Sequence, residues 1–264
     1  MWIAAEPGTR PSVTSRYPNE LWIVRHGQSA GNVARDAAEA GGLVEIDLPA
    51  RDMDVPLSDL GSSQARALGR WIGAQPADAR PTVVLTSPYV RAAETARLAV
   101  EAAGLTDVPV LVDDRLRERE FGALDGLTRA GIVDRFPDEA RRRALLGKFY
   151  HRPAGGESWC DVGLRLRSLL DTIRLDQGDD RVLLVTHQVV VSMLRYLLER
   201  MSEAEVLEAD RTAEPPNCSV TRYRRETTPE GREVMRLEVV NYVAPLEDEG
   251  AAVTRRPDVA VGPR

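Results

Sequence analysis

The sequence predicts an α/β fold, a three-layer sandwich in which helices cover both faces of a mostly parallel central sheet. Short apolar runs of strand length alternate with longer segments whose apolar residues recur at helical spacing. In addition, two of the three histidines, His26 and His187, come directly after apolar runs. Ligands of open α/β sheets bind outside the carboxyl ends of the strands, so these histidines mark a candidate site.

The expected elements follow in order along the chain. Strands are predicted at 21–25, 82–86, 108–112 and 182–186, and a closing hairpin pairs 219–225 with 233–243. Helices are predicted at about 29–39, 57–74, 87–103, from Gly156 to about 175, and at 189–198, with two short helices within 128–147. The helix at 87 is expected to begin with Ser87 as its N-cap and Pro88 at its first position.

Most of the chain is predicted to form one domain. Its 264 residues, of which 43% are hydrophobic, suffice for a single well-packed core. We expect this domain to span residues 21–244, with a lid-like segment at 127–155. Residues 1–20 are expected to form a flexible N-terminal arm. Residues 245–264 are charged and contain proline and glycine, so a disordered tail is expected there.

Composition excludes several classes of function. The net charge of −6 argues against a general nucleic-acid surface, so a phosphate site in this chain must be a local cluster of arginines. No stretch approaches the roughly 18 apolar residues that a membrane span needs. The two cysteines, Cys160 and Cys218, form no metal-type pair and suggest no disulfide framework, which fits the cytoplasm.

The residues around the two histidines suggest phosphoryl transfer. Such a reaction needs a nucleophile, cations and hydrogen-bond donors around the phosphoryl oxygens, and an acid for the leaving alkoxide. His26 can be the nucleophile, and Arg25 and the backbone N–H groups after Gly27 can hold oxygens. Arg91, one turn into the helix after the second strand, and His187 complete the expected anion site.

Six ordered sequence blocks resemble those of the histidine phosphatase superfamily, which includes the cofactor-dependent phosphoglycerate mutases. The blocks are Arg25-His26-Gly27-Gln28-Ser29 with Asn32, the run Pro56 to Ala65, Ser87-Pro88-Tyr89-Val90-Arg91-Ala92, Leu116 to Gly126, Gly156-Glu157-Ser158, and Val185-Thr186-His187. The resemblance runs from about Leu21 to Leu198 in the family's order. It implies a phosphoglycerate mutase-like fold.

The resemblance also implies roles for individual residues. His26 would be the phosphorylated nucleophile, Arg25, Arg91 and His187 would bind the phosphoryl group, and Glu118 would be the proton donor. Glu120 stays a rival acid two positions on. Residues expected to contact phosphate or line its approach are Gly27, Ser29, Asn32 and Gln188. Gln188 departs from the family pattern, which usually has glycine after the second histidine. We expect this difference to bear on which substrate the protein uses more than on the chemistry of the reaction.

The resemblance leaves several reactions open. In the mutases a long insertion lies between the acid block and the Gly-Glu-Ser block, whereas Glu118 and Glu157 here are only 39 positions apart. We therefore expect water to reach the phosphohistidine, making the protein a phosphomonoesterase of a small phosphorylated metabolite. A mutase-type phosphotransferase is the alternative, and a protein phosphatase or a protein-binding module is a weaker one. We expect no cofactor and no metal, because Arg25, Arg91 and His187 already supply positive charge.

Two charged segments allow more than one interpretation. Residues 129–152 contain seven Lys/Arg and three Asp/Glu, which fits either a solvated helix face or a lid that offers cations to an anionic substrate. The acids of the 41–56 loop match no calcium-binding pattern, so we expect a solvated loop that borders the substrate entrance. The expected partner is a small anionic substrate, with neither nucleic acid nor a membrane involved.

Overall fold

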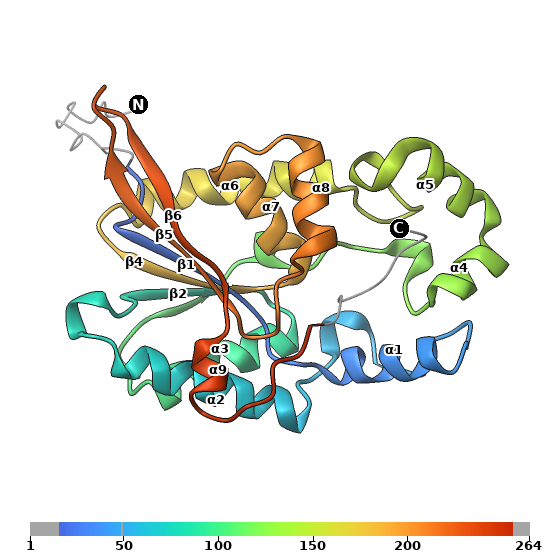
Figure 1. Ribbon diagram of the computed structural model, residues 1–264, viewed down its shortest axis with the longest axis horizontal. Coiled ribbons are helices and arrows are strands. Elements are labelled where there is room, and N and C mark those ends of the chain that lie inside the picture. The colour runs from blue at the N-terminus through green and yellow to red at the C-terminus, as the bar shows by residue number, and fades with distance from the viewer. Residues whose placement is uncertain (1–15, 49, 256–264) are drawn as a thin grey trace, which may run out of the picture.

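A six-stranded sheet in the order β3-β2-β4-β1-β5-β6 forms the centre of the computed structural model, which describes residues 16–48 and 50–255 (Figure 1). The strands are β1 (Glu20–Arg25), β2 (Val83–Thr86), β3 (Val110–Val112), β4 (Arg181–Thr186), β5 (Val220–Thr227) and β6 (Glu233–Tyr242). The first four strands are mutually parallel, and the β5–β6 hairpin adds two antiparallel strands at one edge. The predicted mostly parallel sheet and closing hairpin are confirmed.

Helices cover both faces of the sheet and one end of it. They are α1 (Ala30–Ala40), α2 (Asp59–Ala74), α3 (Val90–Ala102), α4 (Arg129–Arg135), α5 (Pro137–Tyr150), α6 (Trp159–Asp176), α7 (Gln188–Leu198), α8 (Glu203–Thr212) and α9 (Ala244–Glu247). In Figure 1, α6, α7 and α8 lie on one side of the sheet, and α2, α3 and α9 lie on the other. The three-layer arrangement predicted from the alternating pattern is therefore present.

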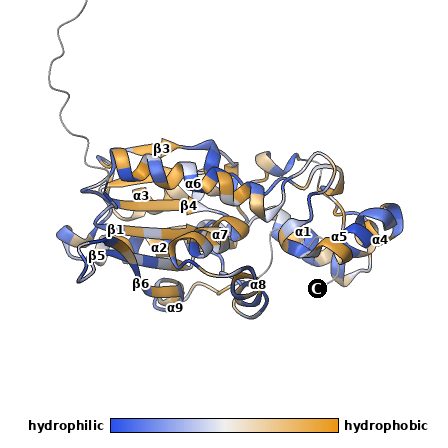
Figure 2. Ribbon diagram, turned by 90° about the horizontal axis from the view of Figure 1, so that it is seen from above, coloured by the Kyte–Doolittle hydropathy of each residue, from blue (hydrophilic) through white to orange (hydrophobic). Residues whose placement is uncertain are grey.

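Alternate residues of β1 face opposite layers, because successive side chains of a strand point to opposite faces. Leu21 and Ile23 pack into a core cluster with residues of α6 and α7. Trp22 and Val24 pack into a second cluster with residues of α2 and α3. All six residues of β1 are buried, and Figure 2 shows β1 and β4 mostly in the colour of hydrophobic residues.

The strand register places the two histidines at the same edge of the sheet. Parallel pairing of β1 with β4 sets Arg25 opposite Thr186, so His26 and His187 follow at the carboxyl ends of neighbouring strands. The backbone N–H of His26 continues this pairing by donating to the carbonyl of Thr186 at 2.8 Å. Helices α1, α4 and α5 lie beyond the sheet at one end (Figure 2).

Several expectations about individual elements were wrong. The third helix begins at Val90 with Tyr89 as its N-cap, so neither Ser87 nor Pro88 starts it. Helix α8 was not predicted, although Ser202 and Glu205 form a capping box at its start. The strand expected at 108–112 is only three residues long, and all three are exposed, because β3 is the sheet edge.

The two terminal segments also differ from the expectation. Arg16 and Asn19 donate backbone hydrogen bonds to Arg174 and Asp180, so the end of the expected N-terminal arm is attached to the domain; residues 1–15 lie outside the described part. The segment expected to be disordered from Pro245 begins within α9, which packs against α2, and Ala251 and Val253 pack against an apolar cluster that includes residues of α2; residues 256–264 lie outside the described part. Its apolar residues bury themselves, as Leu246 is fully buried. Among the described helices, none combines the length and apolar character that a membrane crossing requires.

Candidate active site

His26 is fully buried at the carboxyl end of β1, and its surroundings fix which ring nitrogen carries a proton. Its Nδ1 lies 2.6 Å from the carbonyl oxygen of Gly27. A carbonyl can only accept, so Nδ1 is the protonated nitrogen. In neutral imidazole this leaves the lone pair on Nε2, which lies 3.3 Å from Nε of Arg91. The nitrogen with nucleophilic character thus points at an arginine, where an anion would bind.

The backbone after His26 is held tightly by other parts of the protein. A Cβ on Gly27 would lie 2.5 Å from the carbonyl oxygen of Gly61, so only glycine allows this close approach. The N–H of Gly27 donates to Thr95 Oγ1 at 3.0 Å, and the N–H of Gln28 donates to Gln64 Oε1 at 2.8 Å. The N–H of Gln28, which follows Gly27, was expected to hold a phosphate oxygen. In the structure both N–H groups hold the loop in place instead.

His187 lies beside His26, with ring centroids 5.1 Å apart. The two rings are therefore close enough to contact one phosphoryl group, as predicted from their positions after β1 and β4. Nε2 of His187 lies 2.8 Å from the hydroxyl of Ser87, which is itself fully buried. The ring of Tyr89 packs edge-on against His187 with centroids 5.1 Å apart. Ser87, expected to cap a helix, thus orients the second histidine.

Arg91 is a cation at hydrogen-bond distance from the nucleophilic nitrogen. Its position in the first turn of α3 follows from β2, and its side chain is 3% exposed. Nη1 and Nη2 lie 3.0 and 3.1 Å from the two carboxylate oxygens of Asp52. Asp52 belongs to the 41–56 loop, which was expected to be solvated, and no sequence motif identified it. Its carboxylate lies where oxygens of an incoming anion would approach Arg91.

Arg25 immediately precedes the nucleophile and is fully buried. Its Nη1 donates to the carbonyl oxygen of Pro215 at 2.8 Å, which anchors the guanidinium between β1 and the segment that leads into β5. Burial of an arginine is costly unless hydrogen bonds and negative charge accompany it. A phosphoryl group beside His26 would supply such a charge.

Glu118 and Glu120, the two candidate acids, have different environments. Glu118 is 1% exposed, and its Oε1 accepts the backbone N–H of Arg119 at 2.7 Å. The Glu120 side chain is 47% exposed, and its Oε1 accepts the Tyr89 hydroxyl at 2.9 Å. This loop is tied to the histidine edge because the hydroxyl of Thr186 donates to the carbonyl of Leu116 at 2.7 Å. Glu118 is thus the enclosed acid and Glu120 the solvated one.

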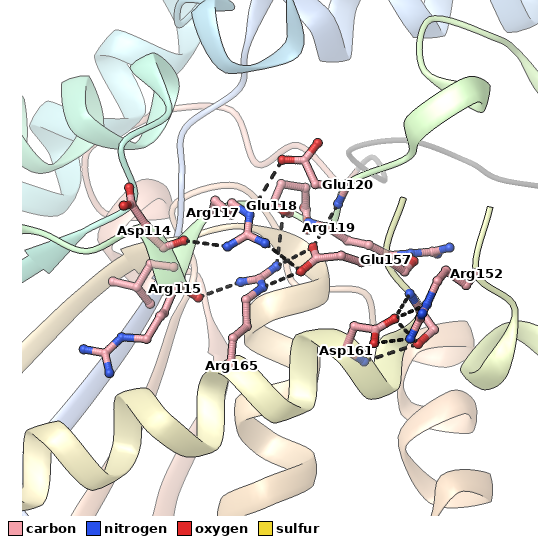
Figure 3. Close-up of polar contacts among 12 residues, drawn as sticks. Asp114, Arg115, Arg117, Glu118, Arg119, Glu120, Arg152, Glu157, Asp161 and Arg165 are labelled. Carbon is pink, nitrogen blue, oxygen red and sulfur yellow. Dashed lines mark hydrogen bonds and ion pairs between the residues drawn. The ribbon is translucent and has the colours of Figure 1, made fainter. Parts of the chain in front are cut away.

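Glu157, in the loop before α6, holds the acid loop in place (Figure 3). Its carboxylate accepts from Arg117 at 2.8 Å, from Arg165 at 2.9 and 3.0 Å, and from the backbone N–H of Glu120 at 3.1 Å. Burial alone would raise the pKa of Glu157, but the hydrogen bonds and charge of Arg165 hold it below its ordinary value. Sequence reasoning matched this residue to a motif but gave it no role.

Three of the expected substrate contacts have structural partners. Ser29 and Asn32 form a reciprocal capping box at the start of α1, with Asn32 Oδ1 2.9 Å from the backbone N–H of Ser29. Nε2 of Gln188 lies 3.5 Å from Asp210 of α8, and Lys148 of α5 forms an ion pair with the same carboxylate. Gln188 thus connects α7 with α8 beside the site. Direct contact of these residues with substrate stays a prediction.

The segment expected to be a lid contains α4 and α5. Some of its arginine side chains are exposed and one is buried. The side chains of Arg141 and Arg142 are 74% and 72% exposed and pair with acids of their own helix. Arg143 is buried, and its Nε and Nη1 have no hydrogen-bond partner within the described residues. Burial and the neighbouring Arg129 lower the pKa of Arg143 to about 10. Arg141 and Arg142 thus lie on a solvated helix face, whereas contact of Arg143 with an anionic substrate stays a prediction.

A cavity of about 60 Å³ lies beside Arg91, between α1, the 46–52 loop and the turn just before the lid. Its lining consists of Ser29, Gly31, Ile46, Leu48, Ala50, Asp52, Arg91, Asp125 and Gly126. Burial, followed by the charge of Asp52, raises the pKa of Asp125 above its ordinary value. The cavity has room for part of a small substrate next to the anion site. Across residues 16–48 and 50–255, no group of three His, Cys, Asp or Glu side chains is arranged to hold a metal ion.

Known proteins resemble this chain over most of its length. The profile of the histidine phosphatase superfamily (branch 1) matches residues 21–239. The 2,3-bisphosphoglycerate-dependent phosphoglycerate mutase 2 of Gloeobacter violaceus is 35% identical over 192 residues, covering 70% of this chain and 78% of that protein. A 2,3-bisphosphoglycerate-dependent phosphoglycerate mutase of Methylobacterium radiotolerans is 33% identical over 223 residues, covering 83% and 96%.

Solved structures of phosphatases share the fold. Mycobacterial glucosyl-3-phosphoglycerate phosphatase superposes with a TM-score of 0.62 at 29% identity, covering 85% of this chain and 99% of that one. The α-ribazole phosphatase of Shigella flexneri superposes with a TM-score of 0.65, but at 20% identity it supports the fold alone. The family profile spans most of the chain and includes both histidines and the acid loop. The chain therefore belongs to the histidine phosphatase superfamily.

Proposed function

We propose that the protein is a phosphomonoesterase that hydrolyses a small phosphorylated metabolite through a phosphohistidine on His26. One observation carries the proposal. The Gly27 carbonyl holds the proton on Nδ1 of His26, while Nε2 faces Arg91 and lies beside His187. A buried imidazole with its lone pair directed at cationic and donor groups is arranged to attack a phosphorus atom.

In the first step, the Nε2 lone pair of His26 attacks phosphorus as the bond from phosphorus to the leaving oxygen breaks. Arg25, Arg91 and His187 surround the three remaining oxygens and stabilise their charge. A protonated Glu118 transfers its proton to the leaving alkoxide, which departs as an alcohol. The cavity beside Arg91 provides space for that alcohol, because it opens next to the anion site.

In the second step, water attacks the phosphorus of phosphohistidine. The carboxylate of Glu118 takes a proton from this water, the N–P bond breaks, and its electron pair returns to Nε2 of His26. Inorganic phosphate leaves, and the protonated Glu118 is ready for another cycle. The carbonyl of Gly27 continues to fix the Nδ1 proton throughout, so the ring keeps its orientation.

The short lid favours hydrolysis over transfer to a second substrate. The chain between Glu118 and Glu157 contains a 3-10 helix at Gly122–Leu124, the helices α4 and α5, and the turns around them. Phosphatases among the solved relatives support the same choice. Transfer as in the mutases is the second candidate, because a relative with that name is 35% identical to this chain over 192 residues.

The buried cation of the lid supports a substrate with a second negative group. Arg143 is buried, it is repelled by Arg129 and attracted by Asp210, and its Nε and Nη1 lack a hydrogen-bond partner within the described residues. An anion that accepts hydrogen bonds from both nitrogens would stabilise such a buried guanidinium. A phosphorylated sugar acid or glycerate carries such a carboxylate in addition to its phosphate.

A panel of phosphomonoesters tests the proposal. We expect release of inorganic phosphate, with a lower KM for esters that carry a second carboxylate or phosphate than for neutral alkyl phosphates. Arg143→Ala should raise KM for the first group at least about fivefold and leave the second unchanged. Arg142→Ala, on the outer face of the same helix, is the matched control. Absence of phosphate release from every ester would overturn the hydrolytic assignment, and interconversion of phosphoglycerates dependent on 2,3-bisphosphoglycerate would establish the mutase instead.

A further inference from the structure

We propose that the segment Ala252–Thr254 is a strap that positions the nucleophile loop, with Thr254 as the positioning residue. The inference concerns the reaction proposed above and rests on it. The segment was expected to lie in a disordered tail. In the structure it reaches the backbone on either side of Gly27 through two fully buried amide side chains, Gln64 and Asn217.

Thr254 joins these two amides. Its hydroxyl donates to Oδ1 of Asn217 at 2.9 Å and accepts from Nε2 of Gln64 at 3.0 Å. The same Gln64 nitrogen donates to the carbonyl of Ala252 at 2.7 Å. The backbone N–H of Asn217 donates to the Thr254 carbonyl at 3.0 Å. One threonine thus fixes the orientation of both amide groups, because each amide end that faces it can serve only as a donor or only as an acceptor.

The other ends of the two amides hold the nucleophile loop. Nδ2 of Asn217 donates to the carbonyl of His26 at 2.9 Å. Oε1 of Gln64 accepts the N–H of Gln28 at 2.8 Å. Gly27 lies between these two points, and its carbonyl fixes the Nδ1 proton of His26. A change in the orientation of either amide would therefore move the Gly27 carbonyl, which determines the tautomer and the direction of the His26 ring.

The strap has its own anchor. Leu246, Ala251 and Val253 pack into a small apolar cluster whose buried members include residues of α2 and α3 and Cys218. Cys218 has a φ of 54°, a left-handed conformation that is uncommon for residues other than glycine. Its N–H donates to the carbonyl of Arg25 at 3.0 Å. This strained residue links Asn217 to the end of β1 and keeps the Asn217 side chain on the nucleophile loop.

Thr254→Val tests the strap, because valine keeps the shape of threonine and replaces its hydroxyl with a methyl group, which neither donates nor accepts these hydrogen bonds. With a phosphomonoester as substrate, we expect kcat to fall about tenfold and KM to change less than twofold, since a displaced nucleophile slows the chemical step without weakening binding. Thr254→Ser, which keeps the hydroxyl, should restore most of kcat. Thr228→Val at the far turn of the β5–β6 hairpin loses a comparable hydroxyl contact and is the matched control.

The nitrogen NMR shifts of the His26 ring provide a readout that does not depend on turnover. In the wild-type protein we expect a protonated Nδ1 and an unprotonated Nε2, assigned by comparison with His26→Ala. Thr254→Val should shift this pattern towards a mixture of tautomers, which a general loss of stability would not do. A wild-type protein without phosphatase activity would refute the proposed function while leaving this measurement intact. Unchanged ring shifts and a kcat within twofold of wild type would overturn the strap.

Discussion

Replacing Glu157 with glutamine tests whether this carboxylate holds the acid loop in position. Glu157 accepts four hydrogen bonds from Arg117, Arg165 and the backbone of Glu120, and the side chains of Glu157 and Arg165 are only 13% and 10% exposed. Breaking a buried pair by removing one partner costs about 3–5 kcal/mol, but glutamine keeps an accepting oxygen and Arg117 is partly exposed. We therefore expect the free energy of unfolding to fall by about 2–3 kcal/mol.

The same substitution should slow catalysis, because the loop carries Glu118. We expect kcat for alkyl phosphates to fall at least about tenfold, as misplacement of a catalytic group by a fraction of an ångström has effects of this order. Urea unfolding and steady-state kinetics measure the two effects. Glu208→Gln removes an ion pair with Arg211 on the exposed face of α8 and should change neither quantity. A Glu157→Gln protein with wild-type stability and kcat would refute the positioning role.

The stabilisation that Glu157 provides should depend on pH, because it depends on the charge of the carboxylate. The pKa of Glu157 lies below its ordinary value of 4.5 in the folded protein. Its stabilisation is therefore complete above that value and is lost as the pH falls through the lower, folded pKa. The difference in unfolding free energy between wild type and Glu157→Gln should shrink as the pH falls below about 4.5. A difference that stays constant across this range would contradict the charge-based account.

The remaining predictions concern the acid, the second histidine and metal ions. Glu118→Gln should slow alkyl phosphates far more than p-nitrophenyl phosphate, whose leaving group needs no proton, whereas Glu120→Gln should affect both alike; the reverse pattern would move the acid role to Glu120. Ser87→Ala, which removes the hydroxyl 2.8 Å from His187 Nε2, should lower kcat about tenfold. The control Ser63→Ala, on the exposed face of α2, should leave kcat unchanged. Equal kinetics for the two variants would refute the orienting contact. Activity should persist in EDTA after dialysis, and a loss restored by one divalent ion would contradict the prediction of metal-free catalysis.

The parts of the fold that could be predicted are those fixed by local pattern. Apolar runs of three or four residues identified β1, β2 and β4, because buried parallel strands have both faces covered. The same pattern placed His26 and His187 at one edge of the sheet, and the structure brings their rings together. Helix α8 was missed although its capping box is readable in the sequence, since its helical face contains few apolar residues.

The contacts that orient the site could not be predicted, because they join residues far apart in the chain. Ser87 and His187 are 100 positions apart in the sequence. The neighbours of Ser87 in the sequence suggest only a helix cap, and those of His187 suggest only the end of a strand. Asp52 belongs to a polar loop whose composition indicates solvent exposure, yet tertiary packing brings it to Arg91. The C-terminal segment is similar: its charged composition predicted disorder, but a few apolar residues such as Leu246 bury themselves against α2 and α3.

Trapping of a phosphoenzyme tests the central claim most directly. The wild-type protein, mixed with a phosphomonoester and quenched rapidly in base, should carry one phosphate on the peptide that contains His26, stable to base and lost in acid. His26→Ala should fold normally, carry no such phosphate and show no turnover. Phosphate on another residue, or turnover by His26→Ala at the wild-type rate, would contradict the proposed mechanism.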